Sequence, residues 1–169
     1  MARIGRHLYA IAIGSNQPRS GRLTPHRLVE KAIARLSREP FDALAVSTIR
    51  NTAPLGPSRR RYANAAMLVR TVLEPEDMLL RLQNMEHIAG RKRHKIWGAR
   101  TLDLDIVLWS GGCWGSGTLT LPHPLFRVRS FVLDPLAQIA GNWRDPVSGL
   151  TMRQLRMRLK KPVPTGKAG

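Results

Sequence analysis

The sequence predicts an α+β domain with a ferredoxin-like β-α-β-β-α-β core, an antiparallel sheet, and a further hairpin and helices toward its C-terminal end. Three observations support this fold class. Apolar or alternating runs typical of strands are separated twice by longer segments with helical periodicity. Proline and glycine clusters mark the breaks between them. No linker-like segment divides the 169 residues, so we expect a single domain over residues 1–169.

The first half of the chain supplies one strand, one helix and two further strands. Residues 8–13 form an apolar run that stops at a Gly-Ser-Asn turn, as a buried strand would. A helix should begin after Thr24, an N-cap residue that proline follows, because apolar residues then recur at helical spacing. Residues 43–52 and 62–72 have the composition of the second and third strands.

The second half supplies the remaining elements. Pro75 should begin a helix that extends to about Gly90, and an alternating strand follows at residues 102–108. A flexible glycine-rich turn and a short strand are expected next, followed by two helices. The ranges of these four elements are 111–117, 119–121, 132–140 and 151–159. We expect both ends, residues 1–7 and 161–169, to be disordered.

Charge is the unusual bulk property of this chain. There are 28 basic and 11 acidic residues, which gives a net charge of +17 and favours polyanionic partners such as nucleotides, nucleic acid or an acidic membrane surface. The single cysteine, Cys113, excludes an internal disulfide and a cysteine zinc site. The apolar run that begins at Leu8 is too short for a signal core or a membrane span. We therefore expect a cytoplasmic protein.

The segment 91–106 has the clearest chemical pattern. A basic run with one tryptophan leads into a strand that carries Asp103 and Asp105, whose side chains point to the same face. Paired carboxylates suit Mg²⁺, which combines one or two protein carboxylates with substrate phosphates, and the basic run would hold those phosphates. A half-exposed strand beside a solvated loop is the alternative that the spacing leaves open. Because P-loop and Rossmann motifs are absent, side chains must supply any phosphate binding.

Several other residues have both a functional and a structural interpretation. Glu86 lies on the inward side of the second helix and would hold a basic side chain or a ligand group, or form a surface salt bridge. Trp97, in the basic loop, would stack on a ligand or pack in the core. Asn64, on the same strand face as Tyr62, could bind the edge of a heterocycle or cap a turn. His123, between two prolines, favours a polar role.

Phe131, which closely follows Arg129, is the last of these residues and could form a second aromatic wall or belong to the core.

Six motifs, in order along the chain, resemble those of the 6-hydroxymethyl-7,8-dihydropterin pyrophosphokinases of folate biosynthesis. They are IAIGSN at 11–16, TAPLG at 52–56, YAN at 62–64, RKR at 91–93, WGARTLDLD at 97–105 and LPH at 121–123. The resemblance extends from about residue 9 to 140 without a large gap. Its most specific part is RTLDLDI at 100–106.

The resemblance implies transfer of the β,γ-pyrophosphoryl group of ATP to the hydroxymethyl oxygen of the pterin, with release of AMP. It implies ATP as co-substrate and two Mg²⁺ ions as cofactors, held by Asp103 and Asp105. Arg91 and Arg100 would act on the phosphates with them as catalytic residues. The implied pterin-binding residues are Thr52, Leu55, Tyr62, Asn64 and Phe131. The implied ATP-binding residues are Gln83, Glu86, Arg93, Trp97, Ile106, Thr120, His123 and Arg129.

This chain departs from the family pattern at a few positions. Ile96 stands where a basic residue is usual, and Pro124 stands where an aromatic residue is common. The arginine run 59–61 and the net charge are also unusual for the family.

Two other functions are compatible with parts of this sequence. A basic ferredoxin-like module could bind nucleic acid, but such a module stacks bases on sheet aromatics, whereas this sheet carries acids. A non-catalytic paralogue is disfavoured by the intact Asp103, Asp105, Arg91 and Arg100. We therefore expect ATP and the pterin as partners, a monomer, and no nucleic-acid or membrane partner.

Overall fold

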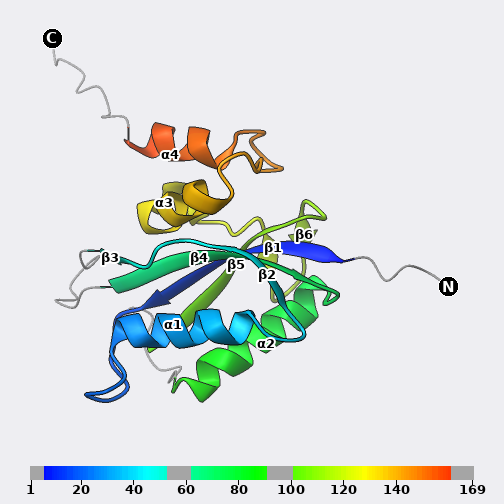
Figure 1. Cartoon of the computed structure of the whole chain (residues 1–169). Coiled ribbons are helices and arrows are strands. Elements are labelled where there is room, and N and C mark those ends of the chain that lie inside the picture. The colour runs from blue at the N-terminus through cyan, green and yellow to red at the C-terminus, as the bar shows by residue number, and fades with distance from the viewer. Residues whose placement is uncertain (1–5, 53–61, 91–100, 161–169) are drawn as a thin grey trace, which may run out of the picture.

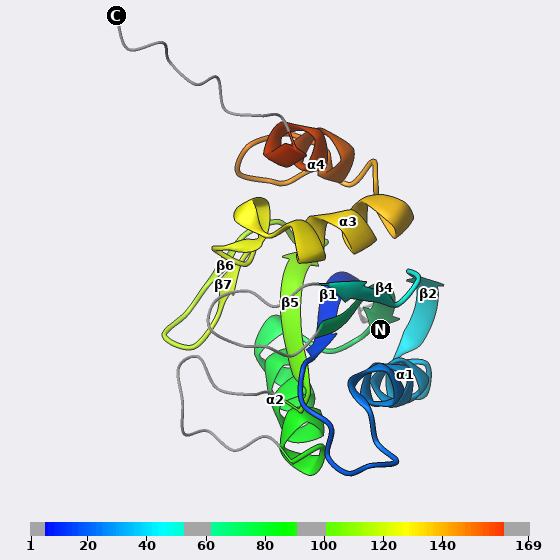
Figure 2. The ribbon, with the colours of Figure 1, turned by 90° about the vertical axis from the view of Figure 1, so that its left-hand side faces the viewer.

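The computed structural model describes residues 6–52, 62–90 and 101–160, in which an antiparallel sheet lies between two layers of helices (Figures 1 and 2). Helices α1 (Pro25–Leu36) and α2 (Pro75–Ile88) cover one face of this sheet. Helix α3 (Ser130–Ile139) covers part of the other face, and α4 (Met152–Lys160) packs on α3.

The main sheet has the strand order β2-β4-β1-β5, and a short strand, β3, also pairs with β4. All of these pairings are antiparallel. This order and the β-α-β-β-α-β succession are those of a ferredoxin-like core, so the predicted fold class is confirmed. The bounds are β1 His7–Ser15, β2 Asp42–Val46, β3 Arg50–Thr52, β4 Tyr62–Thr71 and β5 Asp103–Trp109.

The second predicted strand, residues 43–52, is divided into β2 and β3. At the division, the Ser47 Oγ accepts a hydrogen bond from the Ala66 amide at 2.8 Å, so a side chain replaces a regular ladder contact. Thr48 then donates from its amide and its hydroxyl to the Gln138 side chain of α3, at 3.2 and 3.1 Å. These side-chain bonds satisfy the backbone where the strand pairing is interrupted.

The glycine-rich segment 111–117, predicted to be a flexible turn, contains strand β6 (Trp114–Gly115), which pairs with β7 (Thr120–Leu121). Glu76, in the first turn of α2, holds this hairpin. Its carboxylate accepts from the Trp114 indole at 3.2 Å and the Thr118 hydroxyl at 2.8 Å. The hydrogen bonds from the hairpin, which also include one from Ser116, lower the pKa of Glu76.

One predicted disordered position is also ordered. His7 begins β1, and its Nε2 lies 3.0 Å from a carboxylate oxygen of Glu74. Residues 1–5 and 161–169 lie outside the described part of the chain.

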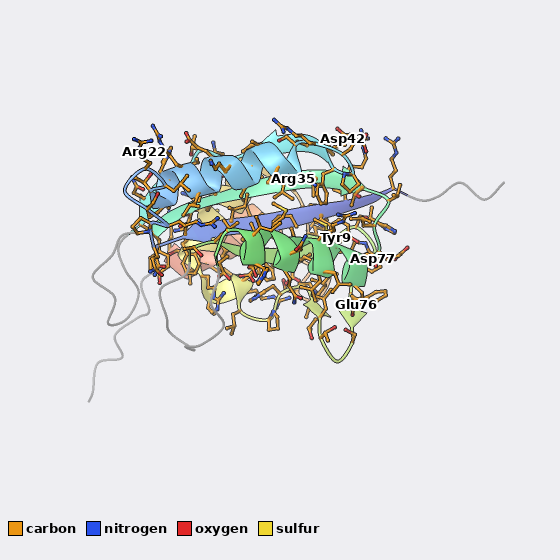
Figure 3. The ribbon with its side chains drawn as sticks, turned by 90° about the horizontal axis from the view of Figure 1, so that it is seen from below. Tyr9, Arg22, Arg35, Asp42, Glu76 and Asp77 are labelled. Carbon is orange, nitrogen blue, oxygen red and sulfur yellow. The ribbon has the colours of Figure 1, made fainter. Side chains whose placement is uncertain are left out.

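The sheet separates two apolar cores, because successive residues of β1 point to opposite faces. Tyr9, Ile11 and Ile13 face α1 and α2 and are buried. Figure 3 views the molecule from the side of these two helices, with Tyr9 labelled beside α2 and Arg22 at the outer edge of the view. The Tyr9 hydroxyl donates to the Leu73 carbonyl at 2.7 Å, and burial, with the Glu74 and Asp77 charges, raises its pKa.

The second core lies between the sheet and α3 and α4. It contains Ala10 and Ala66 from the strands, together with Phe126, Leu133 and Met152, all fully buried. Complete burial of one such large apolar side chain contributes roughly 1.5–3 kcal/mol to folding.

Helix α1 has the predicted side-chain cap at its N-terminus, whereas α2 has none. The Thr24 hydroxyl accepts from the Arg27 amide at 3.4 Å at the start of α1, as expected for an N-cap. Helix α2 instead carries Glu76 and Asp77 in its first turn, where negative charge is favourable. Among the described helices, none is long and apolar enough to cross a membrane.

Candidate functional site

The register of the sheet aligns three residues in one row. Gly14 of β1 is paired with Asn64 of β4 on one side and with Asp103 of β5 on the other. Directly paired residues of antiparallel strands point to the same face, so the three share the face on which α3 packs. Two strand spacings separate Asn64 from Asp103, which is about 10 Å. The middle position has no side chain, so the sheet surface is lowest between an amide and a carboxylate.

In the next row on the same face, Ala12 of β1 is paired with Ala66 of β4 and with Asp105 of β5. Asp103 and Asp105 are both half-buried, whereas the intervening Leu104 is buried on the opposite face. The predicted shared orientation of the two carboxylates is therefore confirmed. They lie on β5, the strand at one end of the sheet order.

Asn64 has a fixed orientation. It is only 4% exposed, and its Nδ2 donates to the Thr52 hydroxyl at 2.7 Å. On the other side, a Cβ added at Gly14 would lie 3.2 Å from the Asn64 Oδ1. The Asn64 amide is therefore held by the hydrogen bond to Thr52 on one side, and the absence of a side chain at Gly14 leaves room for it on the other. Tyr62, half-buried and two residues earlier on β4, points to the same face.

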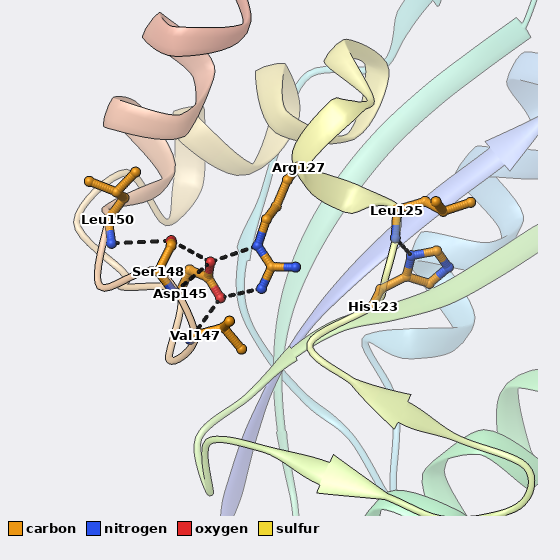
Figure 4. Close-up of polar contacts among 7 residues, drawn as sticks. All are labelled: His123, Leu125, Arg127, Asp145, Val147, Ser148 and Leu150. Atoms are coloured by element: carbon orange, nitrogen blue, oxygen red, sulfur yellow. Dashed lines mark hydrogen bonds and ion pairs between the residues drawn. The ribbon is translucent and has the colours of Figure 1, made fainter.

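Asp105 is faced by two side chains from the segment that follows β7. Its Oδ2 lies 3.9 Å from the His123 Nε2 and 3.9 Å from the Arg129 Nη1. The His123 Nδ1 accepts a hydrogen bond from the Leu125 amide at 3.1 Å (Figure 4). This bond places the proton of a neutral imidazole on Nε2, toward Asp105.

The charge state of His123 follows from its surroundings. Burial lowers its pKa, and the positive charge of Arg129 lowers it further, while Asp105 and Asp103 act in the opposite direction. The net effect is a lowered pKa, so the ring is neutral at pH 7 and can donate one hydrogen bond from Nε2.

Arg129 also connects this acidic edge to an aromatic side chain. Its guanidinium carbon lies 5.8 Å from the ring centroid of Phe131, which is half-buried in the first turn of α3. A cation at this distance from a ring face is weakly attracted to it. Phe131 therefore stands next to the residues that surround Asp105.

The start of β5 is held by two hydrogen bonds from other elements. The buried carboxylate of Glu86, on α2, accepts from the Leu104 amide at 2.7 Å. The Ser15 hydroxyl donates to the Thr101 carbonyl at 2.5 Å. Because Leu104 lies between Asp103 and Asp105, Glu86 fixes the backbone from which both carboxylates project. The predicted role of Glu86 in holding a basic side chain or a ligand group stays a prediction, whereas its burial rules out the alternative of a salt bridge on the helix surface.

The predicted site residues are distributed unevenly. Those gathered on or beside the α3-facing end of the sheet are Thr52, Tyr62, Asn64, Asp103, Asp105, His123, Arg129 and Phe131. Gln83 lies one turn before Glu86 on α2, and Thr120 is exposed on β7. Five others, Leu55, Arg91, Arg93, Trp97 and Arg100, lie outside the described residues.

Ile106 does not present its side chain to this site. It is 3% exposed and packs in the core beneath α1 and α2, because it follows Asp105 in a strand and must face the other way. Only its main chain is available for the predicted contact with ATP. Conversely, Gly14 has no role that is evident from the sequence. Its position in the motif at 11–16 was noted, but its neighbours depend on strand register.

The donor set fits magnesium that arrives with a phosphorylated ligand. Among the described residues, no group of three or more His, Cys, Asp or Glu side chains could enclose a metal ion. Mg²⁺ is usually held by one or two carboxylates together with substrate phosphates rather than by an all-protein cage. Asp103 and Asp105 supply this number and type of ligand.

The sheet thus carries paired carboxylates on β5, a guanidinium and an imidazole that face one of them, and an amide on the same face. These groups suit the class of nucleotide-dependent transferases that act on a heterocycle. The family model for 7,8-dihydro-6-hydroxymethylpterin-pyrophosphokinase matches residues 10–141. This chain belongs to that family, whose members are ATP-dependent pyrophosphokinases of folate biosynthesis.

Two curated relatives show the extent of the similarity. The 2-amino-4-hydroxy-6-hydroxymethyldihydropteridine pyrophosphokinase of Pseudomonas aeruginosa is 38% identical over 138 residues, which are 80% of this chain and 82% of the relative. The protein of the same name from Synechocystis is 43% identical over 100 residues, which are 59% of this chain and 51% of the relative. The match thus spans about half the length of the Synechocystis protein.

The fold itself is found in a larger protein. The wild-type Plasmodium falciparum HPPK-DHPS crystal structure aligns with 91% of this chain and 41% of its own, with a TM-score of 0.72. At 12% sequence identity, this similarity concerns the fold alone.

Proposed function

We propose that this chain transfers the β,γ-pyrophosphoryl group of ATP to the hydroxymethyl oxygen of 6-hydroxymethyl-7,8-dihydropterin, as a step of folate biosynthesis. A bond forms between this oxygen and the β-phosphorus, and the bond between that phosphorus and the bridging oxygen of the α-phosphate breaks. AMP leaves, and the hydroxyl proton is lost to solvent or a nearby acceptor. The observation that supports the proposal is the row Asn64–Gly14–Asp103, which sets the Asn64 amide on the same sheet face as the carboxylate pair, about 10 Å from Asp103.

In this proposal the pterin lies over Gly14. Asn64, held by Thr52, offers amide groups to the edge of the heterocycle, and the rings of Tyr62 and Phe131 supply aromatic contacts. The glycine matters because a flat ring needs close approach to the sheet. Leu55, the remaining predicted pterin-binding residue, lies outside the described part of the chain.

The phosphates would lie along the edge strand. Asp103 and Asp105 would hold Mg²⁺, which, when bound, neutralises charge that develops on the transferred group. Arg129 and the neutral His123 face Asp105 and can donate to phosphate oxygens. Arg91 and Arg100 are the further phosphate-binding side chains that the motif implies. Most of the catalytic effect would come from positioning and electrostatics, as in other phosphoryl transfers.

The test is incubation of the protein with ATP, Mg²⁺ and 6-hydroxymethyl-7,8-dihydropterin, with separation of the nucleotide products. AMP and the pterin diphosphate should appear in equal amounts. A pterin with a methyl group in place of the hydroxymethyl group is the matched control and should yield no AMP. Formation of ADP instead of AMP would indicate transfer of a single phosphoryl group, and absence of both would refute the proposal.

A further inference from the structure

The turn at residues 145–150 contains none of the candidate site residues. It is nevertheless hydrogen-bonded to the segment that carries three of them, His123, Arg129 and Phe131. The Asp145 side chain is fully buried. Its two oxygens accept from the Arg127 Nε and Nη2, each at 2.7 Å (Figure 4). Such a two-pronged contact between a carboxylate and a guanidinium fixes direction as well as distance.

Hydrogen bonds within its own turn hold the Asp145 carboxylate in place. The Asp145 carboxylate also accepts from the amides of Val147 and Ser148, both at 3.2 Å. The turn is closed by main-chain bonds from Asp145 to the Leu150 carbonyl at 2.9 Å and from Gly149 to the Asp145 carbonyl at 2.8 Å. Gly149 has a φ of 71°, a conformation that favours glycine. Asp145 thus presents its oxygens to Arg127 from a rigid turn.

This turn also explains the acidity of Asp145. Burial alone raises the pKa of a carboxyl group, but the hydrogen bonds from Arg127, Ser148 and Val147 outweigh it and lower the pKa to about 2. The hydrogen bonds to Asp145 and its negative charge raise the pKa of Arg127. Both groups are therefore charged at neutral pH.

Arg127, the basic residue of the pair, belongs to the segment that carries His123 and Arg129. Arg127 lies in the 3₁₀ turn η1 (Phe126–Val128), between His123 and Arg129. Its guanidinium carbon is 4.7 Å from the ring centroid of Phe126, which is fully buried. The Arg129 amide donates to the Phe126 carbonyl at 3.2 Å, so η1 leads directly into α3.

The junction between η1 and α3 is packed through the buried Phe126 and Leu133, but its helix start has no side-chain cap. Among the described residues, no side chain caps the N-terminus of α3, where Arg129 occupies the cap position. Helix starts normally gain order from such a cap. The two hydrogen bonds between Arg127 and Asp145 connect this junction to the turn at residues 145–150.

We propose that Arg127 and Asp145 are positioning residues of the site: they set the direction of η1 so that His123 and Arg129 face Asp105 and Phe131 faces the pterin. The inference rests on the proposed function for its catalytic consequences. Its structural part, the ordering of the segment from His123 to Leu133, is independent of any activity. A displacement of about 1 Å in a catalytic group can reduce the rate about 100-fold.

A purely structural role is the alternative, and the chain offers a matched control. Arg156 and Lys160 of α4 bind Asp134 of α3, with nitrogen–oxygen distances of 2.5 and 3.0 Å. This cluster also joins the C-terminal segment to the rest of the protein, but it includes no residue of η1. Arg156→Gln should therefore lower stability without changing the site.

The experiment compares Asp145→Asn, Arg127→Lys and Arg156→Gln with the wild type. Amide hydrogen exchange is measured at Arg129, Val132 and Leu133, whose amides are hydrogen-bonded in this junction, and at the strands β1 and β4. We expect the first two variants to lose protection at the junction more than at the strands, and the control to retain it. Arg127→Lys keeps the charge but not the planar fork, so it remains informative if Asp145→Asn does not fold.

Kinetics supply the second readout, at a temperature well below the unfolding transition. We expect kcat/KM for ATP to fall about 10–100-fold in both variants and to stay near the wild-type value in Arg156→Gln. Unchanged junction exchange together with unchanged kcat/KM would overturn the proposal. If the wild type forms no AMP, the proposed function fails, whereas the hydrogen-exchange comparison still decides whether the pair orders the junction.

Discussion

Gly14→Ala is the substitution that tests the arrangement of the site most directly. The added Cβ would lie 3.2 Å from the Asn64 Oδ1, closer than an ordinary contact, so Asn64 must move by a few tenths of an ångström. Gly14 does not have the positive φ that disfavours alanine, so its backbone accepts the change without strain.

The expected effect on stability is small. Loss of the glycine reduces the freedom of the unfolded chain and favours folding by roughly 0.4–1 kcal/mol, while the tight contact costs about 1 kcal/mol or slightly more. These contributions nearly cancel. A net change within about 1 kcal/mol corresponds to a shift in Tm of roughly 2–4 °C for a protein of this size.

The expected effect on the pterin is larger. The shift of Asn64 strains its 2.7 Å bond to Thr52 and its contact with the heterocycle, and one such hydrogen bond contributes roughly 0.5–1.5 kcal/mol. The methyl group also occupies the surface on which the ring should rest. We expect KM for the pterin to rise about tenfold, which corresponds to about 1.4 kcal/mol, with a smaller change in KM for ATP.

Steady-state kinetics with each substrate varied in turn, together with thermal unfolding, measures both effects. Gly21→Ala is the matched control, because a Cβ there meets nothing within 4 Å and its φ is ordinary. An unchanged KM for the pterin in a normally folded Gly14→Ala protein would refute the reasoning. So would an equal rise in KM for ATP.

Three further predictions follow from other contacts. Asp103→Asn or Asp105→Asn should abolish AMP formation while the circular dichroism spectrum and Tm remain normal; near-wild-type turnover would exclude these carboxylates as magnesium ligands. Glu86→Leu should lower the unfolding free energy by about 1–3 kcal/mol because the buried Leu104 amide loses its acceptor, whereas Glu86→Gln should retain more stability; equal losses in urea unfolding would contradict this. The pKa of Asp145, lowered from 3.8 to about 2, should contribute roughly 2 kcal/mol of stability that is fully present above about pH 4 and is lost as the pH falls toward 2. The stability difference between the wild type and Asp145→Asn should therefore shrink across that interval, and a difference that does not change with pH would refute it.

The order of the core elements could be predicted because each is encoded locally. The Thr24 cap and the apolar spacing after Pro25 determine α1, and period-two alternation determines the common face of Asp103 and Asp105. The same alternation also bears on Ile106. Its side chain must oppose that of Asp105, so the family-based ATP contact could not be transferred to the side chain.

Features that depend on distant partners could not be read from the sequence. Glycines at 111–117 suggested flexibility, but the hairpin there is held by Glu76, far upstream in the chain. The division of the second strand depends on Ser47 bonding across to Ala66. Gly14 acquires its role only when register brings Asn64 and Asp103 to its two sides. Such pairings are set by the packed sheet rather than by local preference.

The two cores on opposite sides of the sheet have a consequence for how substitutions combine. Side chains such as Val29 and Leu36 in α1 are buried on the face opposite to Asn64 and Asp105 and belong to a different apolar cluster from Phe126 and Leu133. Effects on free energy usually add when two positions are more than about 7–10 Å apart and share no neighbours. Stabilising changes beneath α1 should therefore combine additively with changes that retune the ligand-binding face. This would allow the two properties to be selected one after the other in the same protein.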